Sequence, residues 1–201
     1  MLAITEAAGG SVVNRDRMWH YVEGVRNWHP LSPGHAIRIL PGPSSMWFDA
    51  RGNRLPAPFL PGFDTLGTLD HLRHTGFDHS WFVLNRALAG KEFALSGSEQ
   101  NLDLTEKRYR DVLRRPVTKV TPSVQAFLDH GEDWVTAATI GELVAKMNEL
   151  TPDAPLDPAY IERQVVERDR QVDNLFTKDT QVAAIRVARR YRGDRLTKRA
   201  F

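Results

Sequence analysis

The spacing of the glycines constrains this chain more than any other feature of its sequence. There are 14 glycines among 201 residues, yet no two of them are separated by a single residue. The chain therefore lacks the Gly-x-Gly-x-x-Gly turn, whose bare backbone lets a pyrophosphate approach a helix N-terminus. It also lacks a P-loop, a Gly-x-Ser-x-Gly nucleophile elbow and a His-Glu-x-x-His pair. We expect no dinucleotide cradle of the usual kind in these residues.

The local patterns favour an α+β fold in which helices outnumber strands. The apolar run 45–49 meets the turn Ala50-Arg51-Gly52-Asn53 and continues into Arg54-Leu55, which predicts a β-hairpin. Further strands are predicted at 11–14, 37–40, 80–84 and 134–137. Capping residues, prolines and helical periodicity predict helices at 2–8, 64–73, 85–92, 103–114, 122–130, 140–149, 158–173 and 177–192.

The composition is that of a globular protein with a real core. Hydrophobic residues make up 41% and charged residues 26% of the chain. The absence of cysteine excludes a disulfide framework and a thiolate metal site. The first residues do not read as a signal peptide, and no apolar run approaches the roughly 18 residues that a membrane helix needs. We therefore expect a cytoplasmic protein without a membrane partner.

One glycine- and proline-rich loop gathers residues that can bind a ligand. Trp28, His29 and His35 lie in it, beside Arg38. Arginine offers a planar fork of donors, and histidine can donate or accept near neutral pH, so the set could hold an anionic or carbonyl-bearing substrate. A surface loop whose aromatic residues fill space is the alternative interpretation.

Two other functions have some support in the sequence. His71, His74 and His79 could ligate zinc for a metal-dependent hydrolase, although a helix C-terminus explains them equally simply. An Arg-rich C-terminus could make the chain a stand-alone module that binds an acidic partner or nucleic acid. Because the formal net charge is only +2, a solvated helix face is the simpler interpretation, and we do not expect a nucleic-acid partner. The basic residues are Arg186, Arg189, Arg190, Arg192, Arg195, Lys198 and Arg199.

Several stretches resemble a known family. They are NRDRMWHYVEGVRNWHPLSPGHAIRILPGPSSMWFDARGNRLPAPFLPGFDTLGTLDHL, HSWFVLN, KEFALSGSEQN, TIGELVAKMN and PAYIERQVVERDRQVDN. Together they resemble the middle of FAD-binding dehydrogenases, which are similar to ketosteroid dehydrogenases and to the flavoprotein of succinate dehydrogenase and fumarate reductase. The resemblance implies an oxidoreductase that transfers hydride between a substrate carbon and flavin.

The resemblance also implies that this chain is an internal fragment of such an enzyme. Residues 1–30 would end the first portion of the FAD domain, 31–195 would form the cap (substrate) domain, and 196–201 would begin the return to the FAD domain. The fold would be a helix-rich cap with a small β-hairpin or sheet and no Rossmann-type FAD domain. FAD would be bound by the parent protein and not by this chain alone. The partner would be the remaining FAD domain, and the isolated chain would be inactive or self-associated.

The resemblance bears on the site residues as well. His29-Pro30 matches a His-Pro pair beside the dicarboxylate in the fumarate reductase branch. Phe63, within Gly62-Phe63-Asp64, stands where that branch has the catalytic Arg of a Thr-Arg-Asp stretch. This argues against fumarate reduction and suits a small, more hydrophobic substrate. The substrate-binding residues expected are Trp28, His29, His35, Arg38 and Phe63, and no catalytic residue is identified.

Overall fold

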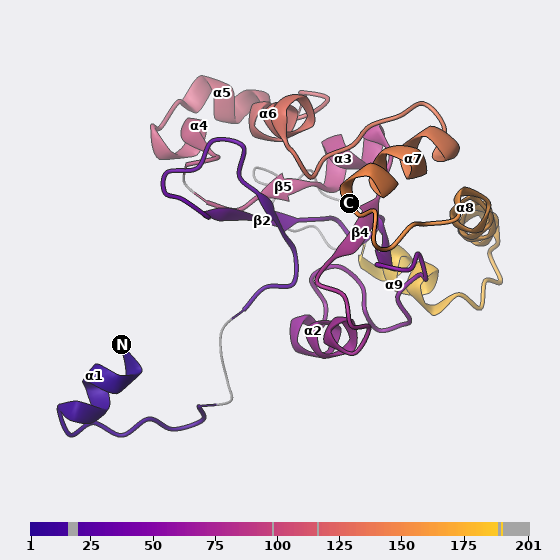
Figure 1. Ribbon diagram of the computed structural model, residues 1–201. Helices are drawn as coiled ribbons and strands as arrows, with labels where there is room; N and C mark the ends of the chain where they lie inside the picture. The colour runs from indigo at the N-terminus through magenta and orange to yellow at the C-terminus, as the bar shows by residue number, and fades with distance from the viewer. Residues whose placement is uncertain (16–19, 98, 116, 189, 191–201) are drawn as a thin grey trace.

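The strands of this chain form two small antiparallel sheets among its helices (Figure 1). The computed structural model describes residues 1–15, 20–97, 99–115, 117–188 and 190. The strands are β1 (Gly24–Arg26), β2 (Ala36–Leu40), β3 (Met46–Asp49), β4 (Ser80–Val83) and β5 (Ala94–Leu95). The helices are α1 (Leu2–Ala7), α2 (Thr65–Arg73), α3 (Arg86–Glu92), α4 (Leu102–Thr105), α5 (Tyr109–Arg114), α6 (Pro122–His130), α7 (Ile140–Leu150), α8 (Pro158–Asp173) and α9 (Thr180–Ala188). Mixed helix and sheet was expected, whereas the cap designation stays a prediction.

The first sheet has the strand order β1-β2-β5 and packs against α6. Side chains alternate between the two faces of a strand, so Ile37 and Ile39 of β2 point together into the core. They meet Phe93, Val124 and Phe127 there. Phe127 is fully buried, and burial of a side chain of this size stabilises the fold by about 1.5–3 kcal/mol. This sheet and α6 form one of two hydrophobic clusters.

The second sheet pairs β3 with β4 and packs against α7 and α8. All four residues of β3 are buried, and Phe48 meets Val144 and Met147 of α7. The predicted hairpin is partly right. Its turn is present, since Asp49 Oδ1 accepts hydrogen bonds from the backbone N–H groups of Arg51 (2.9 Å) and Asn53 (2.8 Å). The strand partner, however, is β4, and Arg54 joins Phe48 only through an isolated bridge.

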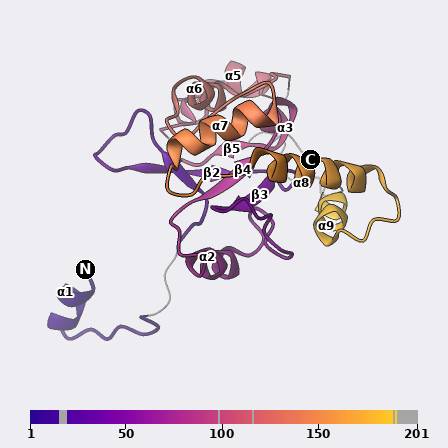
Figure 2. The ribbon, with the colours of Figure 1, turned by 45° about the vertical axis from the view of Figure 1, so that its right-hand side comes forward.

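The helices begin where polar side chains can satisfy the first free N–H groups. The N-cap Thr139 of α7 accepts from the backbone N–H of Glu142 at 3.2 Å, and Asp157 of α8 accepts from Ala159 at 3.0 Å. Pro158 occupies the first turn of α8, where no N–H is needed. In Figures 1 and 2, α4, α5 and α6 lie on one side of the strands and α2 lies on the other.

Residues 41–45 form a buried connection between β2 and β3. The Ser44 backbone N–H and hydroxyl donate to the two carboxylate oxygens of Glu92, at 3.0 and 2.8 Å. Arg168 of α8 donates to the Ser44 carbonyl at 2.6 Å. A Cβ at Gly42 would collide with the side chain of Glu92. Glycine is therefore required at position 42 for Glu92 to reach Ser44.

Three sequence predictions of local structure are wrong. Residues 11–14 and 134–137 are irregular and not strands. Trp134 packs its ring edge-on against Phe93, 5.0 Å between centroids, and belongs to the first core. The predicted helix 103–114 divides into α4 and α5 at Lys107, whose φ of 54° cannot continue a right-handed helix.

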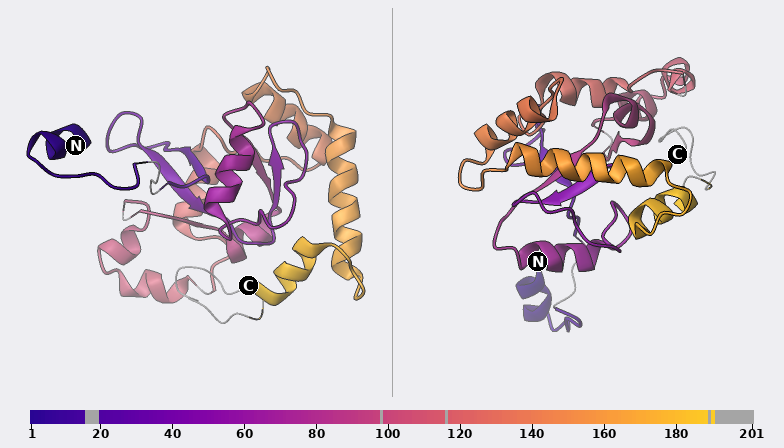
Figure 3. Two further views of the ribbon diagram at one scale, coloured as in Figure 1. Left: turned by 90° about the horizontal axis from the view of Figure 1, so that it is seen from below. Right: turned by 90° about the vertical axis from the view of Figure 1, so that its right-hand side faces the viewer.

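The two ends of the chain differ in how they are packed. No residue of α1 is buried, and α1 stands apart from the strands in Figures 1 and 2. Helix α8 runs along the edge of the fold, with α9 at its end (Figure 3). The proposed division at residue 30 stays a prediction, although the pairing of β1 with β2 crosses it.

Within the described ranges, no helix has both the length and the apolar character to cross a bilayer.

Candidate functional site

A pocket of about 380 Å³ opens at the end of β2 and is the best candidate site. Most of its wall is apolar, and two charged side chains interrupt it. The lining residues are Glu23, Arg38, Ile39, Leu40, Pro41, Pro43, Pro61, Gly62, Phe63 and Ala188. A concave apolar wall with a few polar groups is typical of small-molecule sites. We call this site the Glu23 pocket.

Glu23 is the most unusual residue of the pocket. It is a carboxylate that is only 2% exposed. Its Oε1 accepts a hydrogen bond from the backbone N–H of Gly62 at 3.2 Å, but its buried Oε2 has no hydrogen-bond partner among the residues that the structure describes. The Ile39 N–H donates to the Glu23 carbonyl at 3.2 Å and fixes the backbone beside β2. A buried charged oxygen without a partner is costly, so its position in a pocket wall indicates a functional group.

Arg38 and Phe63 are the two predicted site residues that the structure brings together. Arg38 lies on β2, with its guanidinium carbon 3.9 Å from the centroid of the Tyr21 ring. Its Nε is buried and finds no hydrogen-bond partner in the described part of the chain. Phe63 lies across the pocket with 58% of its surface exposed. Cation–π contact with Tyr21 fixes the guanidinium at the pocket wall.

The other predicted site residues lie outside the pocket. The ring of Trp28 contacts the rings of His29 and His130, with centroids 5.4 and 4.9 Å apart. His35 Nε2 lies 3.1 Å from Glu99 Oε1. The pKa of Glu99 is lowered by a backbone hydrogen bond and then by the hydrogen bond from His35. Their role in substrate binding stays a prediction.

Glu23 and Tyr21 were missed by the sequence reasoning. They lie in 15–29, an aromatic stretch without a clear period. The signal that could have found Glu23 is an acidic residue between Val22 and Gly24 at the start of a short strand. Such a position places a carboxylate beside the sheet, where a charge requires a partner.

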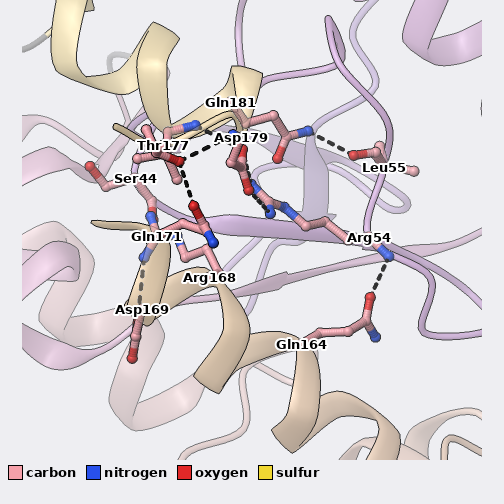
Figure 4. A network of polar contacts seen from close by, with 11 residues as sticks. Ser44, Arg54, Leu55, Gln164, Arg168, Asp169, Gln171, Thr177, Asp179 and Gln181 are labelled. Atoms are coloured by element: carbon pink, nitrogen blue, oxygen red, sulfur yellow. Dashed lines mark hydrogen bonds and ion pairs between the residues drawn. The ribbon is translucent and has the colours of Figure 1, made fainter. Parts of the chain in front are cut away.

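A second hollow, of about 430 Å³, has a largely polar lining. The hydrogen bonds among the side chains around it hold the fold together (Figure 4). Arg54 donates to Asp179 with both Nη atoms, at 2.6 and 3.3 Å. Gln164 of α8 donates to the Gly52 carbonyl and Gln181 of α9 to the Leu55 carbonyl, both at 2.7 Å. We call these four side chains, Arg54, Gln164, Asp179 and Gln181, the Arg54 cluster. They fix the turn after β3 to the last two helices.

The pKa of Asp179 reflects this environment. Burial raises it, but hydrogen bonds from Arg54 and from the backbone of Val182 and Gln181, with the charge of Arg54, outweigh burial and leave the pKa below its usual value. The carboxylate is therefore ionised and paired at neutral pH.

The two alternative functions find little support in the structure. Within the described ranges, no three His, Asp or Glu side chains are grouped to hold a metal. His71 packs on Phe59, and His74 Nδ1 lies 2.7 Å from the Asp70 carbonyl. In the basic C-terminus, Arg186 donates to the carbonyls of Val172 and Asn174, which caps the end of α8. Arg189, Arg192, Arg195, Lys198 and Arg199 lie outside the described residues.

Where the structure describes the chain, all strand pairs are antiparallel. A Rossmann-type site needs parallel strands joined by a helix whose N-terminus meets the pyrophosphate. The described residues contain no pair of parallel strands joined in this way.

Comparison with known proteins places these observations in context. Residues 1–197 match the protein family described as FAD binding domain. Over 198 residues the chain is 55% identical to a KsdD-like steroid dehydrogenase of Mycolicibacterium smegmatis, covering 98% of this chain and 36% of the relative. Over 196 residues it is 55% identical to KsdD-like steroid dehydrogenases of two Mycobacterium tuberculosis strains, covering 97% of this chain and 35% of each relative. The chain therefore spans about a third of the length of these curated relatives. No solved structure matches it significantly.

Proposed function

Because this chain belongs to the FAD-binding domain family, we propose that it forms the substrate-side region of a longer FAD-dependent dehydrogenase. We place the dinucleotide cradle in other parts of that protein, and the antiparallel pairing of all described strands supports this placement. This proposal keeps the assignment to a cap (substrate) domain. It also keeps the expectation that the isolated chain is inactive.

The Glu23 pocket is the observation that carries the proposal. Its apolar wall suits a hydrophobic substrate, and Phe63 places an aromatic ring at its rim. The relatives at 55% identity are named steroid dehydrogenases, and a steroid has the size and character that such a wall accommodates. We propose that the substrate is a steroid-like molecule and that Arg38 orients one of its polar groups. The apolar wall excludes water from the part of the substrate that it covers.

Exposed apolar side chains support the idea of a missing partner domain. Leu175 and Phe176, in the loop between α8 and α9, are 85% and 90% exposed. The Phe176 N–H donates to Asn174 Oδ1 at 2.9 Å, which orders the backbone while the ring stays in solvent. Ordered, exposed apolar residues are typical of interaction sites. We propose that they face the remainder of the parent protein, or a second copy when the chain is isolated.

A chimera tests the proposal. This chain would replace the 198 matched residues of the Mycolicibacterium smegmatis relative, and FAD content and steroid-dependent dye reduction would be measured. We expect a yellow, active chimera that loses activity at least about tenfold with Arg38→Ala, because the substrate is no longer oriented. Glu149→Gln, an exposed change on α7, is the matched control.

The isolated chain provides the opposite test. Titration of the 201-residue chain with FAD should show no stoichiometric binding. A yellow isolated chain that binds FAD tightly and reduces a dye without any other polypeptide would contradict the proposal.

A further inference from the structure

Two polar atoms in the wall of the Glu23 pocket lack partners in the described structure. They are Oε2 of Glu23 and Nε of Arg38, and both are buried. No ion pair joins the two side chains, although both line the same pocket. Buried polar groups in proteins are almost always hydrogen-bonded, so an unmatched acceptor and donor in one pocket wall require a third group. A bound ligand is the group that a pocket supplies.

The backbone around Glu23 leaves one carboxylate oxygen available. The Gly62 N–H holds Oε1 at 3.2 Å, which orients the carboxylate. Gly62 has a φ of 77°, and no atom lies within 4 Å of the place where a Cβ would stand. The space beside Gly62 is therefore open, and Oε2 of Glu23, which is itself buried, would meet a ligand there once the carboxylate turns toward it.

The charges of the two residues define the polar group that fits. A ligand carboxylate would be repelled by Glu23, and a ligand ammonium would be repelled by Arg38. A hydroxyl both donates and accepts, so it can donate to Glu23 while accepting from Arg38. The rest of the wall consists of Gly62 and of proline, leucine, isoleucine, phenylalanine and alanine side chains, which favour an apolar body.

We propose that the Glu23 pocket binds an apolar molecule through a hydroxyl group, and that Glu23 accepts the hydrogen bond of this hydroxyl. The inference rests on the proposed substrate-side function and names the chemical class that the same pocket selects. Glu23 is a specificity residue here and takes no part in bond making or breaking.

Two-dimensional NMR of the ¹⁵N-labelled chain tests this directly. The probes are testosterone and its deoxy analogue, which keeps the ketone but lacks the hydroxyl. The Gly62 amide reports on Glu23, because it donates to the carboxylate, and the exposed Gly141 on α7 is the control amide. We expect testosterone to shift the Gly62 resonance and to bind about tenfold more tightly than the analogue, because a hydrogen bond to a charged acceptor discriminates to this extent.

Variants separate the carboxylate from the shape of the pocket. Glu23→Leu should reverse the preference, so that the analogue binds more tightly, and Glu23→Gln should reduce it to less than about threefold. Glu149→Gln should keep the wild-type preference. If Glu23→Leu fails to fold, Glu23→Gln alone decides the matter.

Each other outcome overturns the inference. An unchanged preference in both Glu23 variants would show that the carboxylate does not select the hydroxyl. Equal binding of the two probes to the wild-type chain, or no shift of Gly62 with either, would also refute it. The proposed flavoprotein function would survive these results, because the chimera tests it through FAD content and dye reduction.

Discussion

An arginine and a carboxylate lie in each of two regions of this chain, and the two regions differ in how these side chains are hydrogen-bonded. In the Arg54 cluster, Arg54 and Asp179 come from distant parts of the sequence and form two direct hydrogen bonds. In the Glu23 pocket, Glu23 directly precedes Gly24, the strand partner of Arg38, yet among the described residues Glu23 and Arg38 each keep a buried atom without a partner. In the first arrangement the carboxylate of Asp179 is paired and stabilises the fold, although Nε of Arg54 also lacks a partner among the described residues. The second leaves hydrogen-bonding capacity for another molecule, which is how binding sites differ from structural ion pairs.

The largest expected effect comes from a matched pair of glycines, one in each region. Gly52 (φ 80°) and Gly62 (φ 77°) both have left-handed backbones. A Cβ at Gly52 would lie 2.8 Å from Ile161 Cδ1, whereas a Cβ at Gly62 would meet nothing within 4 Å. Gly52→Ala should therefore cost about 3 kcal/mol of unfolding free energy, from backbone strain plus overpacking. Gly62→Ala should cost only about 1 kcal/mol.

Urea unfolding of the two variants measures this difference. Equal losses would show that the turn after β3 is no more tightly packed than the pocket rim, and the comparison would fail.

A smaller effect is expected from breaking the ion pair of the Arg54 cluster. Asp179→Ala leaves Arg54, whose side chain is 20% exposed, without its carboxylate. The expected loss is about 2 kcal/mol, because hydrogen bonds between charged groups are removed from a partly buried site. Asp169→Ala is the control, since Asp169 is 66% exposed and lies 3.7 Å from Arg168. It should cost less than about 1 kcal/mol.

The measurement is again urea unfolding, at neutral pH. Similar costs for Asp179→Ala and Asp169→Ala would mean that the Arg54 cluster is not a structural ion pair.

The pH dependence of the unfolding free energy tests the ion pair of the Arg54 cluster further. Because the folded pKa of Asp179 is below its usual value of 3.8, its contribution to stability is complete above that value and is lost as the pH falls through the folded pKa. The wild-type chain should therefore lose more unfolding free energy between about pH 6 and about pH 3 than Asp179→Asn does. Asp103, whose pKa is also lowered, by its hydrogen bond from Arg115, contributes equally to both proteins. Parallel stability curves would contradict the ionised pairing of Asp179.

The smallest effect on stability is expected at Glu23. Replacement by Leu removes a buried carboxylate that is only partly hydrogen-bonded, and the backbone N–H of the exposed Gly62 can donate to water instead. The unfolding free energy should either increase or fall by less than about 0.5 kcal/mol. Thermal and urea unfolding provide the measurement. A loss above about 2 kcal/mol would make Glu23 a structural residue and remove the distinction between the two regions.

The sequence predicted the elements whose signals are local. Helix α7 follows from the Thr139 cap and the apolar spacing of Val144 and Met147, both of which are buried. Its cap and its buried face act within one segment, so neither depends on distant residues. The turn after β3 was likewise evident from Gly52, whose φ is positive.

The structural predictions that failed concern elements that depend on contacts with residues distant in the sequence. The short strands β1 and β5 were not predicted, because three and two residues carry no period and exist only through pairing with β2. Residues 134–137 have the residue types that favour a strand, yet Trp134 packs against the rings of Phe93 and Phe127. Of the residues that line the candidate pocket, Arg38 and Phe63 were among the predicted site residues, whereas Glu23 was not. The partner of Glu23, Gly62, lies 39 residues further along the chain, and no local pattern reveals such a contact.

The connection at 41–45 has a consequence for how this pocket could change in evolution. Pro41 and Pro43 belong to its floor, while Ser44 is held by Glu92 on one side and Arg168 on the other. Substitutions in this connection would disturb the contacts of a buried acid, Glu92, and of Arg168 on α8 at once, so most of them should be selected against. New ligand preferences should arise instead at the rim, where Phe63 can be exchanged without disturbing the scaffold beneath.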